Sequence, residues 1–280
     1  MITTAVVLAA GLGSRMQKAV EENSLNKEEK ESIRKGLKGM ILGLDRRPMF
    51  DSTLQNLIDA GIKRIIFVVN EIGGHMIKEH YGNKIGKVKI DYAVQKEQLG
   101  TANAIYSAKD AAGDESFITM WYDDVYPVEA IKRLVRIKSE WGAIGFDRDG
   151  LENPELTNLK KAKVRQCAVM QVNEKYELLK IIERPGDTQD DYPDPDGKIL
   201  INMGLFAFNK RIFECYPHVE PVERHPGRKE YEIQPAVQYG VDKLGMKMIV
   251  EPFYGGVIDL TALEDVPGAK EFTRDRKLSF

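Results

Sequence analysis

Residues 9–15 (AAGLGSR) could hold a phosphate group, because two glycines and an arginine directly follow a short apolar run. The glycines would let the backbone approach an anion closely, and successive N–H groups could form an anion-binding nest. Arg15 adds a permanent positive charge. A dinucleotide fingerprint needs a third glycine where Met16 stands, and a P-loop needs a following Gly-Lys-Ser/Thr, so both are excluded. A Gly-x-Gly pair alone also fits an ordinary tight turn.

The first half of the chain alternates strand-like and helix-like segments. Short buried strands that alternate with helices predict a mainly parallel sheet covered on both faces. In such a sheet, ligands bind beyond the carboxyl ends of the strands, so segments 9–15, 70–74, 95–101 and 121–127 are candidates for contact with a ligand. The predicted strands are 5–8, 65–69, 88–94, 117–120 and 143–146, and the predicted helices are 48–60, 74–81, 101–109 and 128–139.

The second half is richer in strand signals. Residues 164–172 and 178–183 flank a polar turn and predict a hairpin, and 199–208 and 246–251 predict two further strands. An acidic, proline-rich loop covers 187–198. We expect this β-rich material to lie beside the parallel sheet and not to form a separate domain. The predicted fold class is therefore α/β: a Rossmann-like, mainly parallel sheet flanked by helices, with a β-rich insertion.

A charged stretch covers residues 17–37, and within it Asn26 and Glu29 have the spacing of a capping box. This pattern predicts a surface helix that interrupts a loop. The sequence leaves two interpretations open for the stretch: a solvated insertion, or a mobile lid over the nearby glycine turn.

Composition excludes several classes of protein. The 280 residues include 41 Lys and Arg against 43 Asp and Glu, a net charge of −2, which argues against a nucleic-acid-binding surface. With 42% hydrophobic and 30% charged residues, the chain has a globular composition. No apolar run approaches about 18 residues and no signal-peptide pattern is present, so no membrane contact is expected. Two cysteines fit a reducing environment, and we predict a cytoplasmic location.

Six ordered motifs resemble those of the sugar-1-phosphate nucleotidyltransferases, the nucleotide-sugar pyrophosphorylases. Their pattern begins with Gly-x-Gly-Ser/Thr-Arg, a lysine before a short strand, and Lys/Arg-Pro-Met/Leu. A Gln-x-x-x-Leu-Gly-Thr-Ala-x-Ala turn, Gly-Asp-Asn/Asp, Glu-Lys-Pro, Asn-x-Gly and Asp-x-x-Thr-x-x-Asp follow. The matching segments here are 11–15 with Lys38 and 47–49 (RPM), 95–105 (QKEQLGTANAI), 121–127 (WYDDVYP), 183–185 (ERP), 201–208 (INMGLFAF) and 254–265 (YGGVIDLTALED).

The resemblance implies one nucleotidyltransferase domain over residues 1–280. Its nucleotide-binding part would cover about 1–147 and its sugar-binding part about 148–265, with no C-terminal β-helix domain. The implied reaction is the Mg²⁺-dependent transfer of a nucleoside monophosphate from an NTP to a sugar 1-phosphate. The products would be an NDP-sugar and pyrophosphate.

The resemblance assigns two cations to the reacting phosphates. Arg15 would bind the pyrophosphate moiety, and Lys38 would bind the α-phosphate and the attacking phosphate. Joining two anions requires that their repulsion be offset, and positive charge does this. The family usually has Pro or Ala where Gly39 stands, and an ordinary surface cation is the alternative interpretation of either residue.

Nucleotide contacts are expected from the glycine turn and from a second turn, residues 95–101. A Gln amide offers both a donor and an acceptor, so Gln95 could pair with the edge of a base. The alternative for Gln95 is a surface amide at the end of a strand. The implied nucleotide-binding residues are Ala9, Ala10, Gly11, Gly13, Ser14, Gln95, Leu99, Gly100 and Thr101.

Asp123 and Asp259 are the metal ligands that the resemblance implies. Mg²⁺ prefers oxygen ligands and is typically held by one or two carboxylates together with substrate phosphates. Asp123 or Asp124 could instead cap the helix that begins near Pro127. The family usually has Gly where Tyr122 stands, and Asp124 could share the metal role.

Four residues are implied to bind the sugar phosphate: Glu183, Arg184, Asn202 and Gly204. Glu183 and Asn202 could hydrogen-bond the sugar hydroxyls. Arg184 stands where the family has Lys, and Arg can bind a phosphate with two parallel hydrogen bonds.

Four questions stay open from the sequence alone: the acceptor, the base, catalysis against sensing, and the oligomeric state. The acceptor could be a cyclitol or alditol phosphate, and the base is not specified by backbone contacts and one amide. A non-catalytic nucleotide-sensing protein could share this fold. The β-rich insertion also offers faces on which two copies of the chain could associate.

Overall fold

Successive residues of strand β1 (Thr4–Ala9) face opposite sides of a sheet in the computed structural model of the chain. The structure describes residues 1–11, 13, 16–17, 27–225, 227–274 and 277–280. Ala5 and Val7 belong to one apolar cluster and Val6 to a second, because side chains alternate along a strand. The sheet is therefore covered on both faces, as its continuous apolar strands predict.

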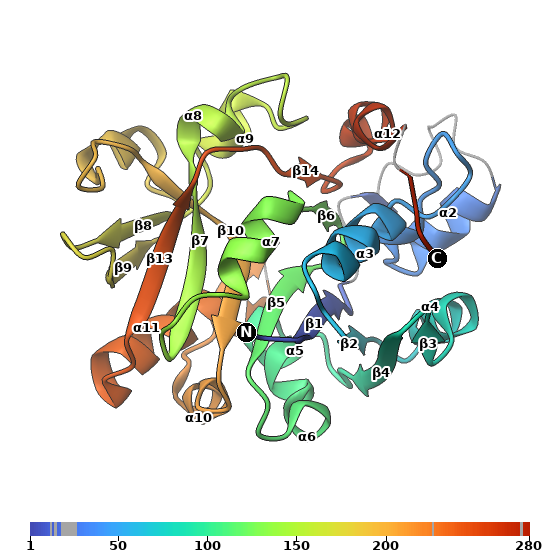
Figure 1. Ribbon diagram of the computed structural model, residues 1–280, viewed down its shortest axis with the longest axis horizontal. Helices are drawn as coiled ribbons and strands as arrows, with labels where there is room; N and C mark the ends of the chain where they lie inside the picture. The colour runs from blue at the N-terminus through green and yellow to red at the C-terminus, as the bar shows by residue number, and fades with distance from the viewer. Residues whose placement is uncertain (12, 14–15, 18–26, 226, 275–276) are drawn as a thin grey trace.

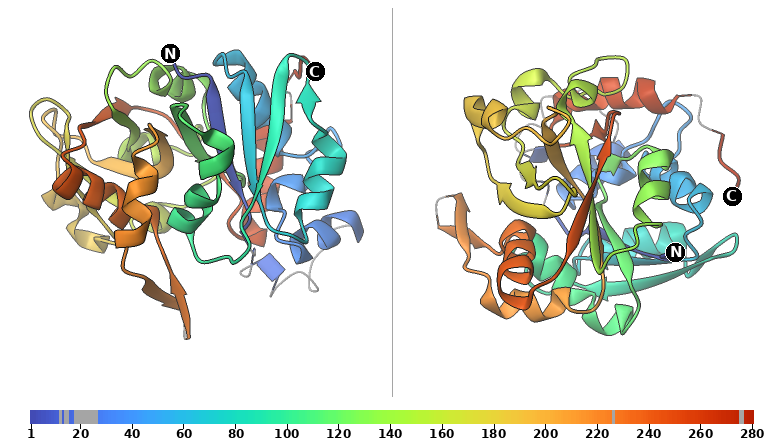
Figure 2. Two further views of the ribbon diagram at one scale, coloured as in Figure 1. Left: turned by 90° about the horizontal axis from the view of Figure 1, so that it is seen from below. Right: turned by 60° about the vertical axis from the view of Figure 1, so that its left-hand side comes forward.

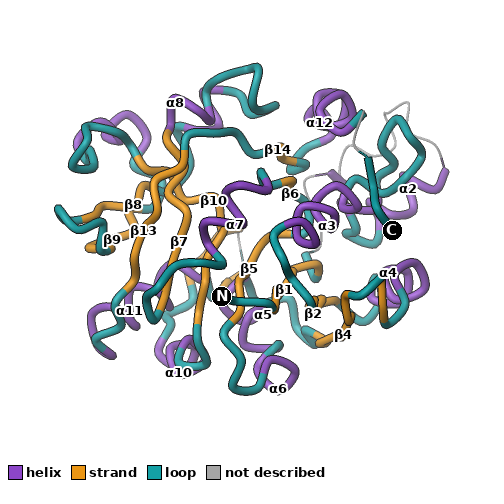
Figure 3. The backbone as a smooth tube through the Cα atoms, viewed as in Figure 1, coloured by secondary structure: helices purple, strands orange, loops and turns teal. Residues whose placement is uncertain are grey.

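Ten strands form the central sheet within the described residues, in the order β13-β7-β10-β5-β1-β2-β4-β3, with β8 paired to β10 and β9 paired to β8 (Figures 1 and 3). Besides β1, their bounds are β2 Arg64–Val69, β3 Lys84–Ile85, β4 Val88–Val94, β5 Phe117–Trp121, β7 Trp141–Asp147, β8 Val169–Val172, β9 Leu178–Ile182, β10 Leu200–Phe208 and β13 Met248–Phe253. A separate pair of short strands, β11 (Val222–His225) and β12 (Arg228–Glu230), forms a small hairpin.

The parallel part of the sheet has the arrangement that the sequence predicts. Strands β1, β2, β4 and β5 pair in parallel, so their carboxyl ends share one edge. Strand β10 lies between β5 and β7 and is antiparallel to both, which brings its amino end to that same edge. The chain thereby places segments from both halves of the sequence at one edge of the sheet.

Helices cover the two faces of this sheet (Figure 2). Leu54 of one helix and Ile131 of another belong to the cluster that contains Val7, whereas Ile105 and Val237 belong to the cluster that contains Val6. The first face carries α3 (Phe50–Asp59), α4 (Gly74–Tyr81), α7 (Val128–Leu134), α8 (Arg148–Leu151) and α9 (Lys161–Val164). The second carries α5 (Thr101–Ser107), α6 (Lys109–Ala112), α10 (Ile212–Cys215) and α11 (Ile233–Leu244).

A third apolar cluster lies beyond the carboxyl edge of the sheet. It joins α2 (Lys27–Arg34) and α12 (Val266–Thr273) to two short strands, β6 (Asp124–Val125) and β14 (Ile258–Asp259), which pair with each other (Figure 3). The cluster consists of Met16, Ile33, Ile41, Met49, Val125, Ile258, Leu260, Leu263, Val266 and Ala269. It fixes the end of the chain against segments near its beginning.

The charged stretch 17–37 is anchored where the structure describes it. Ile33 is fully buried, and the Glu29 carboxylate pairs with Lys270 Nζ of α12 at 2.7 Å. Residues 18–26 lie outside the described residues. The packing of α2 favours a structural part over a lid for residues 27–37.

Three sequence predictions differ from the structure. The helix predicted over 128–139 ends at Leu134, because Trp141 N donates to Lys247 O and draws the chain into the sheet. The strand predicted over 164–172 begins only at Val169, because residues 161–164 form α9. The strand predicted from 199 runs inside the central sheet and not beside it, since all nine residues of β10 are buried. Helices α11 and α12 were not predicted.

Candidate active site

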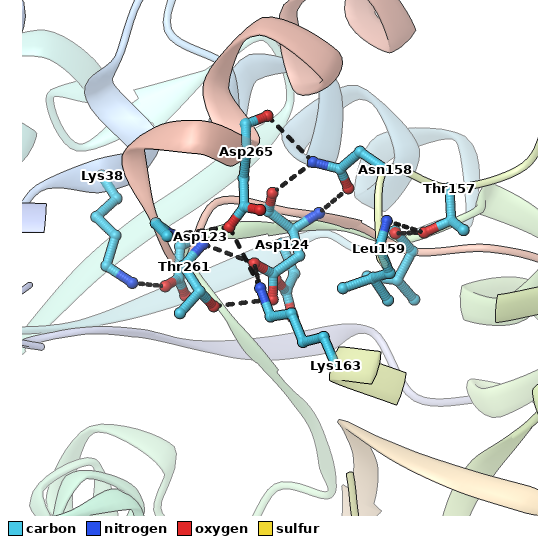
Figure 4. A network of polar contacts seen from close by, with 12 residues as sticks. Lys38, Asp123, Asp124, Thr157, Asn158, Leu159, Lys163, Thr261 and Asp265 are labelled. Carbon is cyan, nitrogen blue, oxygen red and sulfur yellow. Dashed lines mark hydrogen bonds and ion pairs between the residues drawn. The ribbon is translucent and has the colours of Figure 1, made fainter. Parts of the chain in front are cut away.

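Asp123 and Asp259 are brought together by the pairing of β6 and β14. Asp123 directly precedes β6, and Asp259 is the last residue of β14. The pairing sets Asp259 opposite Asp124, and Leu260 N donates to Asp123 O at 3.1 Å. Both strands contribute a residue to the third apolar cluster, Val125 from β6 and Ile258 from β14. Two aspartates far apart in the sequence are therefore neighbours at the sheet edge, where Figure 4 shows Asp123 and Asp124.

Lys38 forms an ion pair with the first of these carboxylates. Its Nζ contacts Asp123 Oδ2, and the two side chains are 14% and 27% exposed. The close approach depends on Gly39, because a Cβ there would lie 2.7 Å from Tyr122 O and as near to the Tyr122 ring. The two departures from the family pattern, Gly39 and Tyr122, thus compensate each other in space.

Lys163 holds the second carboxylate. Its Nζ lies 2.6 Å from Asp259 Oδ1 and 3.2 Å from Asp265 Oδ2 (Figure 4). Burial acts to lower the pKa of Lys163, but the carboxylates of Asp259 and Asp265 outweigh it and raise that pKa above its ordinary value. Lys163 is therefore charged at neutral pH.

Hydrogen bonds fix the backbone and side chain of Asp259 independently of this lysine. Its carboxylate accepts from Thr261 N at 2.6 Å and from Thr261 Oγ1 at 2.9 Å. Asn158 pairs with its backbone, donating to Asp259 O and accepting from Asp259 N, each at 2.8 Å. The Asp265 carboxylate accepts from Ala262 N at 2.7 Å.

Asp124 has a structural environment. Its side chain is buried, and its Oδ2 lies 3.1 Å from the Tyr126 hydroxyl, which also lies 2.8 Å from Met203 O. Burial, and then the charges of Asp259 and Asp123, raise the pKa of Asp124 well above its ordinary value. Its burial and its contact with Tyr126 favour a structural part for Asp124 over a share of the metal role.

The residues present fit a divalent ion held by two carboxylates and by oxygens of the substrates. Asp123 and Asp259 each attract an ammonium group, so positive charge is stabilised at this place. Among the described residues, no group of three or more His, Cys, Asp or Glu side chains could hold a metal ion. Mg²⁺ commonly uses one or two carboxylates and completes its coordination with phosphates and water.

The glycine turn borders a small cavity of about 80 Å³ on the other side of Asp123. Ala10, at the start of the turn, is buried and does not line it. Ser14 and Arg15 lie outside the described residues, so their roles stay predictions. The lining residues are Leu8, Ala9, Gly11, Gly13, Gly36, Lys38, Tyr122 and Asp123.

The second turn is clamped against the start of α11. Gly100 has φ +103°, and a Cβ there would lie 2.6 Å from Tyr231 O, so only glycine fits. Leu99 O accepts from Tyr231 N at 2.6 Å, and Thr101 Oγ1 accepts from Ile233 N at 2.9 Å. The Thr101 hydroxyl thus holds the turn in place.

Gln95 supports the same turn from beneath. It is buried, and its Nε2 donates to Gly100 O at 3.1 Å and to Asn103 Oδ1 at 2.8 Å. Both amide hydrogens are therefore used within the protein. Of the Gln95 amide, only the side-chain oxygen Oε1 could therefore accept a hydrogen bond from a base. The predicted contact between Gln95 and the base is thus narrowed to one atom.

A larger cavity of about 590 Å³ lies beside Asp259. It contains three of the four predicted sugar-phosphate residues, and the fourth, Gly204, donates its N–H to Asn202 Oδ1 at 2.9 Å. Arg184 has φ +47°, an uncommon conformation for a residue other than glycine. The lining residues are Trp121, Leu159, Lys163, Gln166, Cys167, Ala168, Glu183, Arg184, Asn202, Met203, Glu230, Glu232, Gln234, Asp259 and Thr261.

Two buried amide atoms at this cavity have no hydrogen-bond partner within the described chain. They are Asn202 Nδ2, a donor, and Gln234 Oε1, an acceptor. Most buried polar atoms in proteins are hydrogen-bonded, so such atoms beside a cavity indicate a ligand with complementary groups. Hydroxyl groups, which both donate and accept, satisfy both atoms.

Sequence reasoning missed Lys163 and Gln234. Lys163 lies in a KKAK run that is typical of a solvated surface, and Gln234 lies in no motif that we recognised. Only the folded position of α9 and of the start of α11 places them at the cavity. The sequence carried no signal for either residue beyond its polar side chain.

No helix in the described part of the chain has both the length and the apolar character that crossing a bilayer requires.

Comparisons with known proteins identify relatives of this chain. The chain is 26% identical over 233 residues to the UTP–glucose-1-phosphate uridylyltransferase AglF of Haloferax volcanii, covering 83% of this chain and 81% of that protein. It is 28% identical over 245 residues to UTP–glucose-1-phosphate uridylyltransferase 2 of Staphylococcus saprophyticus, covering 76% and 73%.

Solved structures share the fold. A UTP-bound UGPase from Acinetobacter baumannii superposes with a TM-score of 0.71 at 16% identity, covering 99% of this chain and 96% of that one. A UDP-glucose pyrophosphorylase complexed with UDP-glucose gives 0.70 at 17% identity, covering 99% and 100%. The fold class predicted from the sequence, a mainly parallel α/β sheet of the nucleotide-diphospho-sugar transferase type, is confirmed.

The sequence profile of the nucleotidyl transferase family matches residues 34–250, which is most of the chain. Together with the relatives above, this match shows that the chain belongs to the nucleotidyl transferase family.

Proposed function

We propose that this chain transfers a nucleoside monophosphate from an NTP to a sugar 1-phosphate in a Mg²⁺-dependent reaction, releasing pyrophosphate. One observation carries the proposal: Asp123 and Asp259 meet at the sheet edge between the small cavity at the glycine turn and the larger cavity at Asn202. This arrangement supports a phosphate site with room for a nucleotide on one side and for a second substrate on the other.

In this reaction an oxygen of the acceptor phosphate attacks the α-phosphorus of the NTP. The bond from that phosphorus to the bridging oxygen breaks, and pyrophosphate leaves with the electron pair. A phosphate monoester is largely ionised at about pH 7, so no protein base is needed. Lys38 is proposed to neutralise the α-phosphate and Arg15 the pyrophosphate, while the Gly100 turn holds the nucleotide.

Asp123 and Asp259 are the proposed ligands of the divalent ion. When bound, the ion would neutralise charge on the reacting phosphates. By holding the ion at the sheet edge, the two carboxylates would also orient the phosphates.

The acceptor is proposed to be a hydroxyl-rich phosphate. The unpaired atoms Asn202 Nδ2 and Gln234 Oε1 support this, because adjacent hydroxyls satisfy a donor and an acceptor together. Arg184 would bind the acceptor phosphate. Two relatives are named as UTP–glucose-1-phosphate uridylyltransferases, so UTP with glucose 1-phosphate is the first pair to test.

The reaction is proposed for the cytoplasm. Cys167 and Cys215 do not form a disulfide with each other, as a reducing environment requires.

Pyrophosphate release across a matrix of nucleotides and acceptors tests the proposal. The matrix pairs UTP, dTTP, CTP, GTP and ATP with hexose 1-phosphates, an inositol phosphate and an alditol phosphate, with Asp123→Asn as the matched inactive variant. We expect one nucleotide–sugar pair to release pyrophosphate and EDTA to abolish the release. Nucleotide binding without turnover on any acceptor would contradict the enzyme proposal and favour a nucleotide sensor.

A further inference from the structure

Lys163 occupies a position that joins the metal ligands to the acceptor cavity. Its ammonium contacts the carboxylates of Asp259 and Asp265, and its side chain, 30% exposed, also lines the 590 Å³ cavity. The residue therefore has access to both the proposed metal ligand and the proposed acceptor.

The two carboxylates do not need Lys163 to hold their positions. Thr261 donates two hydrogen bonds to the Asp259 carboxylate, and Ala262 N donates one to that of Asp265. Asn158 fixes the backbone of the same segment. These bonds do not involve the ammonium group, so the two carboxylates keep other contacts if it moves away.

A divalent ion and this ammonium group compete for the same oxygen. Lys163 Nζ lies 2.6 Å from Asp259 Oδ1, and a cation bound to that carboxylate would repel it at close range. The side chain already borders the cavity, where an acceptor phosphate offers new negative charge.

We propose that Lys163 changes partners during the reaction: it neutralises Asp259 in the empty site and binds the acceptor phosphate once the divalent ion takes that carboxylate. This inference rests on the proposed function. Because coupling between two ligands is reciprocal, the acceptor strengthens metal binding through Lys163, and the metal strengthens acceptor binding.

Three variants test the exchange: Lys163→Gln, Lys163→Arg, and Lys161→Gln as the matched control. Lys161 lies on the same short helix, is 75% exposed and contacts Glu152 only at 3.8 Å. Thermal unfolding verifies that each variant is folded. The measurements are Mn²⁺ affinity by electron paramagnetic resonance, with and without sugar phosphate, and the KM values of both substrates.

We expect Lys163→Gln to raise the KM of the sugar phosphate about 10-fold or more, because a charge-assisted hydrogen bond is lost. The KM of the NTP should change by less than about 2-fold, because Lys163 does not contact the nucleotide in this proposal. Mn²⁺ alone should bind several-fold more tightly to Lys163→Gln, because its competitor is gone. Lys163→Arg should restore acceptor binding, and Lys161→Gln should match the wild type.

The effect of sugar phosphate on Mn²⁺ affinity distinguishes the proposed exchange of partners from a purely structural role of Lys163. Sugar phosphate should tighten Mn²⁺ binding to the wild type and leave Mn²⁺ binding to Lys163→Gln unchanged. Equal changes in both KM values, or unaltered Mn²⁺ affinity in Lys163→Gln, would overturn the inference while the wild type stayed active. A wild type that releases no pyrophosphate with any pair would instead contradict the proposed function.

Discussion

Two lysine–aspartate pairs border the site, and they differ in what surrounds them. Lys38 and Asp123 contact each other beside the 80 Å³ cavity at the glycine turn, and each makes this one ion pair among the described residues. Lys163 contacts two carboxylates beside the 590 Å³ cavity, and its partner Asp259 accepts further hydrogen bonds. The same kind of charge pair thus stands alone beside the glycine turn and belongs to a network beside the larger cavity.

This difference between the two lysine–aspartate pairs allows effects on turnover to be distinguished from effects on folding stability. Both aspartates are proposed to hold the divalent ion, so both should matter for turnover. Only Asp259 also organises the segment that follows it, through the amide and hydroxyl of Thr261. Substitutions on the two sides should therefore have similar effects on catalysis and different effects on folding.

The largest effect is expected from Asp123→Ala and Asp259→Ala. Each should lower kcat/KM at least about 100-fold, because charge stabilisation of the transition state is lost. Asp259→Ala should also lower the free energy of unfolding by about 1.5–3 kcal/mol, since it removes hydrogen bonds to a buried charged group. Asp123→Ala should lower it by less than about 1 kcal/mol.

Pyrophosphate release and urea denaturation measure these two quantities. Equal losses of stability in the two variants would remove the distinction between the pairs. Full activity of either variant would exclude that aspartate as a metal ligand.

Gly39→Ala probes the nucleotide side alone. Its Cβ would lie 2.6 Å from Cε1 of the Tyr122 ring, so the change should destabilise the protein by about 1–3 kcal/mol and displace Lys38. The double variant with Tyr122→Gly, which exchanges the two residues for the common family pattern, should lose less stability than the sum of the single variants. Additive losses in a double-mutant cycle would show that the two positions are independent.

Gln234→Leu probes the acceptor cavity alone. Loss of the buried, unpaired Oε1 should raise the KM of the sugar phosphate about 5- to 10-fold, because a hydrogen bond to a hydroxyl is lost. The KM of the NTP should stay within about 2-fold. An acceptor analogue lacking one hydroxyl should bind the variant and the wild type equally if that hydroxyl is the partner, and steady-state kinetics with deoxy sugars measure this.

The smallest effect is expected from an ion pair at the opposite edge of the sheet. Glu115 accepts from Thr4 Oγ1 at 2.6 Å and pairs with Arg64 at 3.1 Å, and these contacts lower the pKa of its carboxyl. Because that side chain is half-exposed, Glu115→Gln should cost about 0.5 kcal/mol or less.

The sign of the pH dependence follows from the lowered pKa. The stabilisation is present above the unfolded-state pKa of Glu, about 4.3, and is lost as the pH falls through the lower folded-state value. Wild type and Glu115→Gln should therefore converge in urea midpoint below about pH 4, with equal turnover at pH 7. A change in turnover would show that an ion pair distant from the site still affects it.

Much of the parallel half was predictable from local pattern. The helix predicted over 74–81 and the strand predicted over 88–94 have the observed bounds, because apolar periodicity there coincides with glycines at the ends. The second half was less predictable. Strand β10 is apolar throughout, and such a run does not reveal its position in a sheet.

The candidate site divides in the same way. Asp123, Asp259 and Asn202 could be singled out because they lie in recognisable motifs, and the variants above test the two aspartates. Lys163 and Gln234 could not, because their importance depends on where α9 and α11 pack. Gln95 stood in a motif, yet its amide hydrogens bind Gly100 and Asn103.

By itself, the amino-acid sequence determined the fold class, the family resemblance and the sheet edge at which a ligand is proposed to bind. These depend on residue type and short spacing, which local physics reads directly. Only the tertiary structure decided that β6 and β14 pair, that Asp124 is buried while Asp123 is accessible, and that Lys163 lies on Asp259. Such contacts join residues that are distant along the chain, and burial and charge pairing arise only once the apolar clusters have packed.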